Sequence, residues 1–79
     1  MNIKSRVREV VLDIVEMEAH EVPDNEEFRN LDIDSLMALD MLTDLEREFQ
    51  IKLPEEVLRH FTSIDAITAM LDEKLSVAA

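Results

Sequence analysis

The chain has 79 residues, of which 47% are hydrophobic and 34% charged, and it contains neither cysteine nor glycine. That length allows one domain, spanning 1–79, and the missing cysteines exclude disulfides and cysteine-based zinc sites. Nineteen acidic residues against eight basic ones give a net charge of -11, which disfavours nucleic acid and anionic membranes as partners and favours basic proteins. Acidity alone also keeps a small domain soluble, so the placement of the charges has to decide between these interpretations.

The first half of the chain predicts two helices separated by a long loop. Apolar residues recur every three or four positions from about residue 2 to 18, which is the pattern of an amphipathic helix. Over 19–34 the periodicity stops, and turn-forming residues predict a loop that is ordered because apolar side chains anchor it. The anchors are Val22, Phe28, Leu31 and Ile33. A second amphipathic helix is predicted from Ser35 to Phe49 or Gln50.

The second half predicts one short helix and one longer one. Pro54 ahead of two glutamates is typical of a helix start, so we expect a brief third helix that ends near His60. Residues 62–65, with sequence TSID, resemble a capping box that opens a fourth helix, and the tail 76–79 is expected to fray. No segment has the alternation of a strand. The fold class is therefore all-α, a small four-helix bundle with three longer helices, one short one and a long loop between the first two, and we expect a monomer.

Ser35 lies where the loop meets the second helix, behind Asp34 and ahead of Leu36. The amino end of a helix offers unpaired backbone N–H groups and a partial positive charge, so a phosphate esterified to a side chain there would be stabilised. Position alone favours a plain N-cap role for Ser35 or Asp34, so the position does not by itself establish an attachment site. No base accompanies the serine in this segment and the chain has no glycine for an oxyanion loop, so we expect no catalytic residues.

Residues 28–36, with sequence FRNLDIDSL, resemble the attachment motif of the acyl carrier protein family, in which an Asp-Ser-Leu triplet follows a leucine-anchored loop. Residues 45–49 (LEREF) and 51–54 (IKLP) resemble the same family's passage from helix two into helix three, and the helix pattern fits along essentially the whole chain. The resemblance implies that Ser35 carries a covalent 4′-phosphopantetheine arm, donated by a phosphopantetheinyl transferase from coenzyme A. It implies a carrier that catalyses nothing itself. Such a carrier holds acyl groups as thioesters for acyl-transferring and chain-elongating enzymes of fatty acid, polyketide or related lipid biosynthesis.

Two positions of this motif bear on its details. The family frequently has glycine where this chain has Asp32. Aspartate tolerates a left-handed backbone better than most residues, so we expect the loop to keep its path. Peptidyl carriers commonly have histidine where this chain has Asp34, so the resemblance favours acyl over aminoacyl cargo, although aminoacyl and polyketide cargo stay open.

The outer face of the second helix follows from its rotation of about 100° per residue. Leu36 falls among charged residues, opposite the apolar stripe, and a leucine ringed by carboxylates suits enzymes with basic docking surfaces. The alternative is that Leu36 caps the loop and the charges are simply solvated. The candidate recognition residues are Asp34, Leu36, Met37, Asp40, Asp44 and Arg47. Met37 and Arg47 stand where fatty acid carriers resemble one another in being acidic, so we hypothesise a specialised carrier with a dedicated partner set.

Other residues favour structural roles. Methionines and phenylalanines at helical spacing suit an adaptable cavity for an acyl chain, but they more often form plain core. They are Met17, Met41, Met70, Phe28, Phe49 and Phe61. His20 and His60 lie near predicted helix ends and are expected at the surface. A calcium loop that starts at Asp32 would need glycine and glutamate where Met37 and Thr43 stand, so we expect no metal site.

The main alternative to a carrier is a small helical interaction module that binds a basic partner through Leu36 and Met37 without any prosthetic group. The amount of mass added to Ser35 would separate the two. The sequence opens with neither the apolar region of a signal peptide nor a lipidation motif. We therefore expect a cytoplasmic location and no membrane insertion.

Overall fold

In a computed structural model, which describes residues 2–78, the chain forms three α-helices: α1 (Ile3–Val15), α2 (Ser35–Phe49) and α3 (Ile64–Ala78). Three 3-10 segments connect them: η1 (Ala19–Glu21), η2 (Phe28–Leu31) and η3 (Glu55–His60). Within the described residues there is no strand. The prediction of a small all-α bundle with three longer helices and one short one is confirmed.

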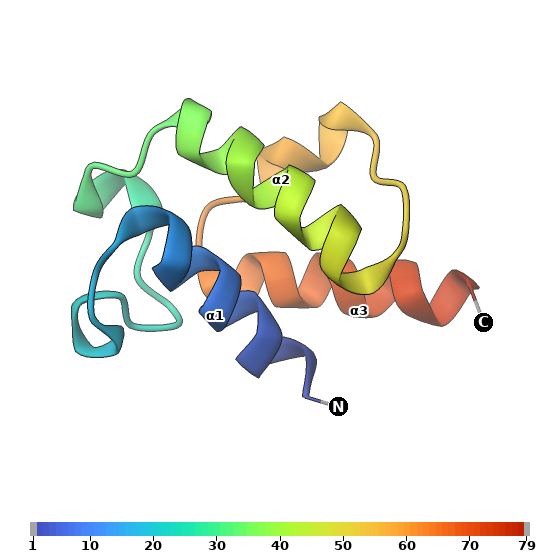
Figure 1. Cartoon of the computed structure of the whole chain (residues 1–79), viewed down its shortest axis with the longest axis horizontal. Helices are drawn as coiled ribbons and strands as arrows, with labels where there is room; N and C mark the ends of the chain where they lie inside the picture. Colours follow the sequence, from blue (N-terminus) through green and yellow to red (C-terminus); the bar gives the residue numbers. More distant parts are fainter. Residues whose placement is uncertain (1, 79) are drawn as a thin grey trace.

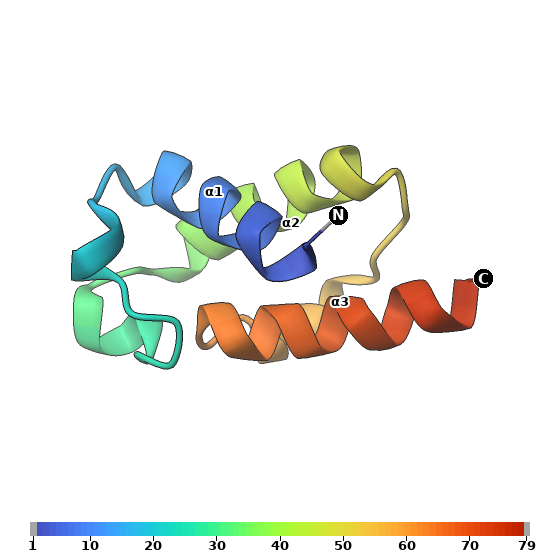
Figure 2. The same ribbon diagram turned by 90° about the horizontal axis from the view of Figure 1, so that it is seen from below.

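The helices lie in two layers (Figures 1 and 2). Seen from below, α1 and α2 lie side by side in one layer and α3 runs beneath them, and η3 contacts both α2 and α3. The inner sides of the layers meet in one hydrophobic core, because each helix turns an apolar stripe inward. Its fully buried side chains are Val7, Val11, Val22, Met41, Leu45, Ile64, Ile67 and Leu71. None of the described helices is long and apolar enough to cross a membrane.

Helix α1 is shorter than the sequence predicts, because it ends at Val15 instead of residue 18. The cause is Glu16, whose backbone is left-handed (φ 56°, ψ 43°) and whose N–H donates to the carbonyl of Leu12 at 2.9 Å. A left-handed residue stops helical propagation and satisfies a carbonyl that the helix end leaves unpaired. The other end is capped by Asn2, whose side chain accepts a hydrogen bond from the N–H of Ser5.

The loop between α1 and α2 is anchored as expected. Val22, Phe28 and Ile33 are buried, and Leu31 packs half-buried against the same core. Backbone hydrogen bonds add to these contacts: the N–H of Phe28 donates to Thr62 at 2.8 Å, just ahead of α3. The loop is thereby held against the end of the molecule where both α2 and α3 begin.

Ion pairs and a backbone hydrogen bond also hold the first part of this loop, around Asp24, against α1 and α3. The Arg8 guanidinium donates to both carboxylate oxygens of Asp24, from Nε at 3.1 Å and from Nη2 at 2.7 Å. The backbone N–H of Asp65 donates to the carbonyl of Asp24 at 2.9 Å, and Lys4 lies 2.9 Å from the Asp65 carboxylate. Asp24 therefore ties the loop to α1 and to the first turn of α3.

The second half of the chain needs one correction, at the start of α3. The short third helix that the sequence predicts is present as the 3-10 segment η3 and ends at His60. Helix α3 is capped by Ser63, whose hydroxyl accepts from the N–H of Ala66 at 3.0 Å, and the predicted capping box does not form because the third position after this cap is Ala66, which has no side-chain acceptor. Helix α3 continues to Ala78 with Leu75 half-buried, residue 79 lies outside the described residues, and the fraying expected over 76–79 stays a prediction.

Candidate functional site

Ser35 is the first residue of α2, and its neighbour Asp34 is the N-cap. Asp34 has an extended backbone (φ -97°, ψ -179°), and its Oδ1 accepts a hydrogen bond from the N–H of Met37 at 3.0 Å. The capping role that sequence left open between the two residues therefore falls to Asp34. The Ser35 side chain is exposed, and no hydrogen bond recorded over residues 2–78 occupies its hydroxyl. That hydroxyl is free to react at a helix amino end.

Asp32 explains how a chain without glycine makes the turn ahead of Ser35. Its backbone is left-handed (φ 59°, ψ 30°) at the end of η2, where the N–H of Ile33 donates to the carbonyl of Phe28 at 3.1 Å. The expectation that aspartate adopts this conformation where the family frequently has glycine is confirmed. The turn directs Ile33 inward to the core and leaves Asp34 and Ser35 exposed at the surface.

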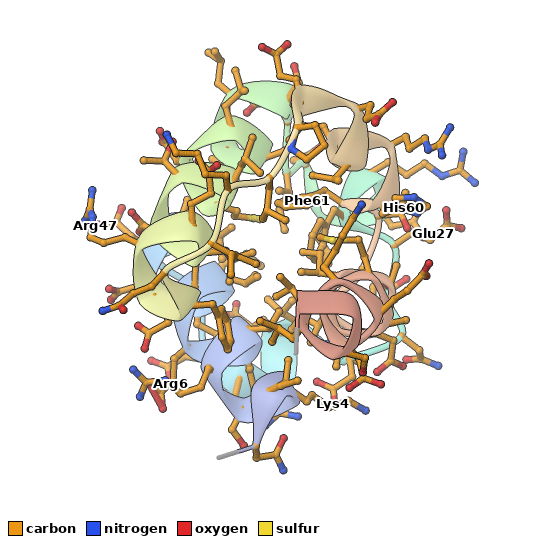
Figure 3. The ribbon with its side chains drawn as sticks, turned by 90° about the vertical axis from the view of Figure 1, so that its right-hand side faces the viewer. Lys4, Arg6, Glu27, Arg47, His60 and Phe61 are labelled. Atoms are coloured by element: carbon orange, nitrogen blue, oxygen red, sulfur yellow. The ribbon has the colours of Figure 1, made fainter. Side chains whose placement is uncertain are left out.

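A pocket of about 290 Å³ opens beside Ser35. Its apolar wall comes from three elements that are distant in sequence, namely the loop, α2 and η3, and Figure 3 shows Phe61 pointing inward from the segment after η3. The apolar lining consists of Phe28, Ile33, Ala38, Leu58 and Phe61. Polar groups of Glu27, Arg29, Asp34 and Thr62 complete it together with the serine. The serine thus stands where a helix end, a charged surface and an apolar pocket meet.

The outer face of α2 carries two exposed leucines. Leu36 is 71% exposed, as its predicted place among the polar residues requires. Leu39 is 40% exposed and was missed, because a rotation of about 100° per residue places it at the border between the polar and apolar sides. Its spacing of three from Leu36 was the available signal. Met37, in contrast, packs half-buried against the core.

The charges on this face are unevenly distributed. Asp40 is exposed, and it has no ion-pair partner among the described residues. Further along the helix, Asp44 pairs with Arg47 at 3.7 Å, and Glu48 is bound by Arg6 of α1. Figure 3 shows Arg6 and Arg47 on the same side of the molecule. The end of α2 near Ser35 therefore keeps its negative charge available, whereas the other end is largely neutralised from within the chain.

The other residues that the sequence singled out are core residues, half-buried residues or exposed surface residues. Four of the six methionines and phenylalanines are buried core residues, with Phe28 and Phe61 also lining the pocket, while Met17 and Phe49 are half-buried. His20 and His60 are exposed, as expected. Over the described part of the chain, no three His, Cys, Asp or Glu side chains are grouped as a metal site requires.

A family model described as the phosphopantetheine attachment site matches residues 5–71. The chain belongs to this family. The prosthetic group of such a phosphopantetheine-attachment domain is 4′-phosphopantetheine, and members of the family are carriers and not enzymes. The residues fit this group, because an exposed hydroxyl lies at a helix amino end beside an apolar pocket. When bound, the arm supplies a thiol that holds acyl groups as thioesters.

Curated relatives agree with this assignment. The chain is 38% identical over 73 residues to polyketide-8 synthase acyl carrier protein 2 of Streptomyces avermitilis, covering 91% of this chain and 84% of that protein. It is 27% identical to the non-reducing polyketide synthase dbaI of Emericella nidulans and 28% identical to the non-reducing polyketide synthase pigA of Monascus ruber, each over 74 residues. Those matches cover 94% of this chain but only 3% of either synthase.

Proposed function

We propose that Ser35 carries the 4′-phosphopantetheine arm and that the domain presents acyl intermediates of polyketide-type biosynthesis to partner enzymes. The observation that carries the proposal is that Asp34 caps the start of α2 and leaves the Ser35 hydroxyl exposed. A transferase can reach such a hydroxyl without disturbing the cap. The phosphodiester formed there benefits from the helix dipole.

The other serines are less suitable attachment sites. Ser63 is buried and its hydroxyl caps α3, so modification would cost both a hydrogen bond and burial of charge. Ser5 is half-buried in the first turn of α1. Ser76 is exposed but lies in the last turns of α3, where the helix dipole disfavours a phosphate.

Partner enzymes dock on the face of α2 next to Ser35. Leu36 and Leu39 supply apolar area, and Asp34 and Asp40 supply negative charge that attracts basic surfaces. Arg47 projects from the neutralised end and disfavours partners that present a basic group there. The phosphopantetheinyl transferase and the acyl-transferring enzymes share this surface, and the pairing of Asp44 with Arg47 supports a dedicated partner set.

Polyketide-type cargo is supported by the 38% identity to a polyketide carrier over most of both chains. Asp34 in place of histidine ahead of the serine is consistent with acyl rather than aminoacyl cargo. The pocket beside Ser35 is mainly apolar and suits the root of an arm or a small acyl group. Fatty acid synthesis is the competing pathway within the same chemistry.

The attachment site is tested by intact mass after incubation with coenzyme A, Mg²⁺ and a broad-specificity phosphopantetheinyl transferase. We expect a gain of about 340 Da in the wild type and in Ser76→Ala, and none in Ser35→Ala. Ser76→Ala is the matched control because it removes another exposed hydroxyl. A gain that survives in Ser35→Ala would place the arm elsewhere, and no gain in any variant would favour an unmodified interaction module.

The cargo is tested on the loaded protein. A malonyl transferase of a polyketide synthase should charge it faster than a fatty acid synthase malonyl transferase does, measured with each enzyme's own carrier as reference. Equal or faster charging by the fatty acid enzyme would contradict the specialised polyketide assignment. Charging by an amino-acid adenylating enzyme would point to aminoacyl cargo instead.

A further inference from the structure

Among the described residues that line the pocket beside Ser35, Arg29 alone is cationic. It belongs to η2, whose backbone is fixed: the N–H of Phe28 is bonded to Thr62, and the N–H of Ile33 returns to Phe28 at 3.1 Å. The Arg29 side chain itself is 79% exposed. A long cationic side chain on a rigid segment therefore stands within the same pocket as the attachment serine.

The present partner of Arg29 is a weak one. Its Nη2 donates to Glu27 at 3.2 Å, and the Glu27 side chain is 50% exposed. Ion pairs at this level of exposure contribute little, because water screens both charges and two long side chains lose conformational freedom. Guanidinium groups bind phosphate oxygens strongly, often through two parallel N–H donors. A phosphate can accept from two of the Arg29 donors, whereas Glu27 accepts from one, so a phosphate at the pocket would compete with Glu27.

A phosphodiester on Ser35 would benefit from such a cation, because some of the backbone N–H groups at the start of α2 already have acceptors. The N–H of Met37 is taken by the Asp34 carboxylate and that of Ala38 by the Asp34 carbonyl at 3.1 Å. The Asp34 carboxylate also adds a negative charge one residue from the phosphate. Two backbone donors, those of Ser35 and Leu36, remain at the amino end of α2 to offset it.

We propose that Arg29 leaves Glu27 on loading and binds the phosphodiester at Ser35, so that it holds the root of the arm at the mouth of the pocket. The proposal rests on the proposed attachment to Ser35. Arg29 acts as a positioning residue: it sets where the arm starts, and it takes no part in chemistry at the distant thiol.

The experiment uses ³¹P nuclear magnetic resonance on fully loaded protein, with loading first verified by mass. We expect the phosphorus resonance to move in Arg29→Gln relative to the wild type, to move less in Arg29→Lys, and to stay in Arg59→Gln. Arg59 is the matched control because it is an exposed arginine on η3 outside this pocket. Glu27→Gln should move the resonance opposite to Arg29→Gln, since it frees the guanidinium for the phosphate.

A second measurement compares the melting temperature of loaded and unloaded protein. Loading should lower the melting temperature more, or raise it less, in Arg29→Gln than in the wild type or Arg59→Gln, because the added charge loses its cation. An unchanged resonance together with an unchanged loading effect in Arg29→Gln overturns the proposal. Failure to load Ser35 at all would instead overturn the proposed function, so the two failures are distinguishable by mass.

Discussion

Gln50 has a left-handed backbone (φ 53°, ψ 49°) at the carboxyl end of α2, where its N–H donates to the carbonyl of Glu46. Glu16 and Asp32 adopt the same conformation at the ends of α1 and η2. A side chain makes this conformation unfavourable by about 1 kcal/mol, and glycine adopts it freely. Because the chain has no glycine, each of these three helix ends is less stable than the same end with glycine at that position would be.

Gln50→Gly should therefore raise the free energy of unfolding by about 0.5–1 kcal/mol, measured by urea denaturation. Asp72→Gly, at an exposed position inside α3, is the control and should lower the same quantity by about 1 kcal/mol, since glycine there costs helix propensity. Destabilisation by Gln50→Gly as large as that of Asp72→Gly would show that the Gln50 side chain has a role in packing.

Substitutions of Leu36 and Leu45, two leucines of α2, separate an effect on partner docking from an effect on stability. Leu36 is 71% exposed and Leu45 is fully buried. Leu36→Ala should raise the KM of the phosphopantetheinyl transferase for the carrier and leave the unfolding free energy within about 0.5 kcal/mol. Leu45→Ala should cost about 2–5 kcal/mol of stability through the cavity it creates. Normal transferase kinetics in Leu36→Ala would argue against docking on this face.

At the scale of elements, α1 connects three other parts of the chain through its basic side chains. Three of its side chains each reach a different part of the chain: Lys4 pairs with Asp65 of α3, Arg6 with Glu48 of α2, and Arg8 with Asp24 of the loop. The Lys4–Asp65 pair is the most exposed of the three, whereas the side chains of the other two pairs are about two-thirds buried and each guanidinium donates twice to its carboxylate. Of these two stronger pairs, the Arg8 pair is the one that reaches the loop, so it should contribute most to holding the loop.

The Arg8–Asp24 pair makes stability sensitive to acid. Hydrogen bonding to Arg8 lowers the pKa of Asp24 below its ordinary value of 3.8, against the opposing effect of burial. A lowered folded-state pKa means that the pair's contribution is complete above pH 3.8 and is lost as the pH falls through the lower folded-state value. Arg8→Gln should melt a few degrees below the wild type at neutral pH, and this gap should close as the pH falls towards about 2.

The control for this acid effect is Arg47→Gln. Arg47 is 77% exposed and lies 3.7 Å from Asp44, so its removal should leave the melting temperature unchanged at either pH. A gap between the wild type and Arg8→Gln that stays constant down to low pH would mean that Arg8 acts through the packing of its hydrocarbon stem and not through the charge on Asp24.

Local sequence signals predicted α2, the anchored loop and the position of Ser35, because periodicity, turn residues and caps act over a few residues. The left-handed Asp32 was expected from the family resemblance, because glycine is frequent at this position in the family and aspartate tolerates the same conformation. What the local signals could not predict depends on distant segments: the pocket joins the loop, α2 and η3, and Arg8 meets Asp24 across the start of the loop. The end of α1 was misplaced because Glu16 gives no sequence signal for a left-handed stop where glycine would.

At the scale of the whole molecule, negative charge exceeds what the fold can pair. Five of the eight basic residues form ion pairs within residues 2–78, and the net charge is still -11. Unpaired carboxylates repel one another most strongly at low salt, because the Debye length of about 30 Å at about 0.01 M is close to the 34 Å length of the domain. The excess favours attraction to basic partners and opposes compactness of the domain alone.

Salt should therefore stabilise this domain. Salt weakens the surface ion pairs as well as the repulsion, but the exposed pairs contribute little, so relief of repulsion should dominate. We expect the melting temperature to rise as NaCl increases from about 0.01 to about 0.5 M. The double variant Asp13→Lys and Asp72→Lys, at exposed sites of α1 and α3, makes the net charge less negative. It should melt higher than the wild type at low salt and respond less to added NaCl. A melting temperature that falls with salt in both proteins would mean that the ion pairs of α1 outweigh the repulsion, and that the acidity of the chain serves its partners at no cost to its own stability.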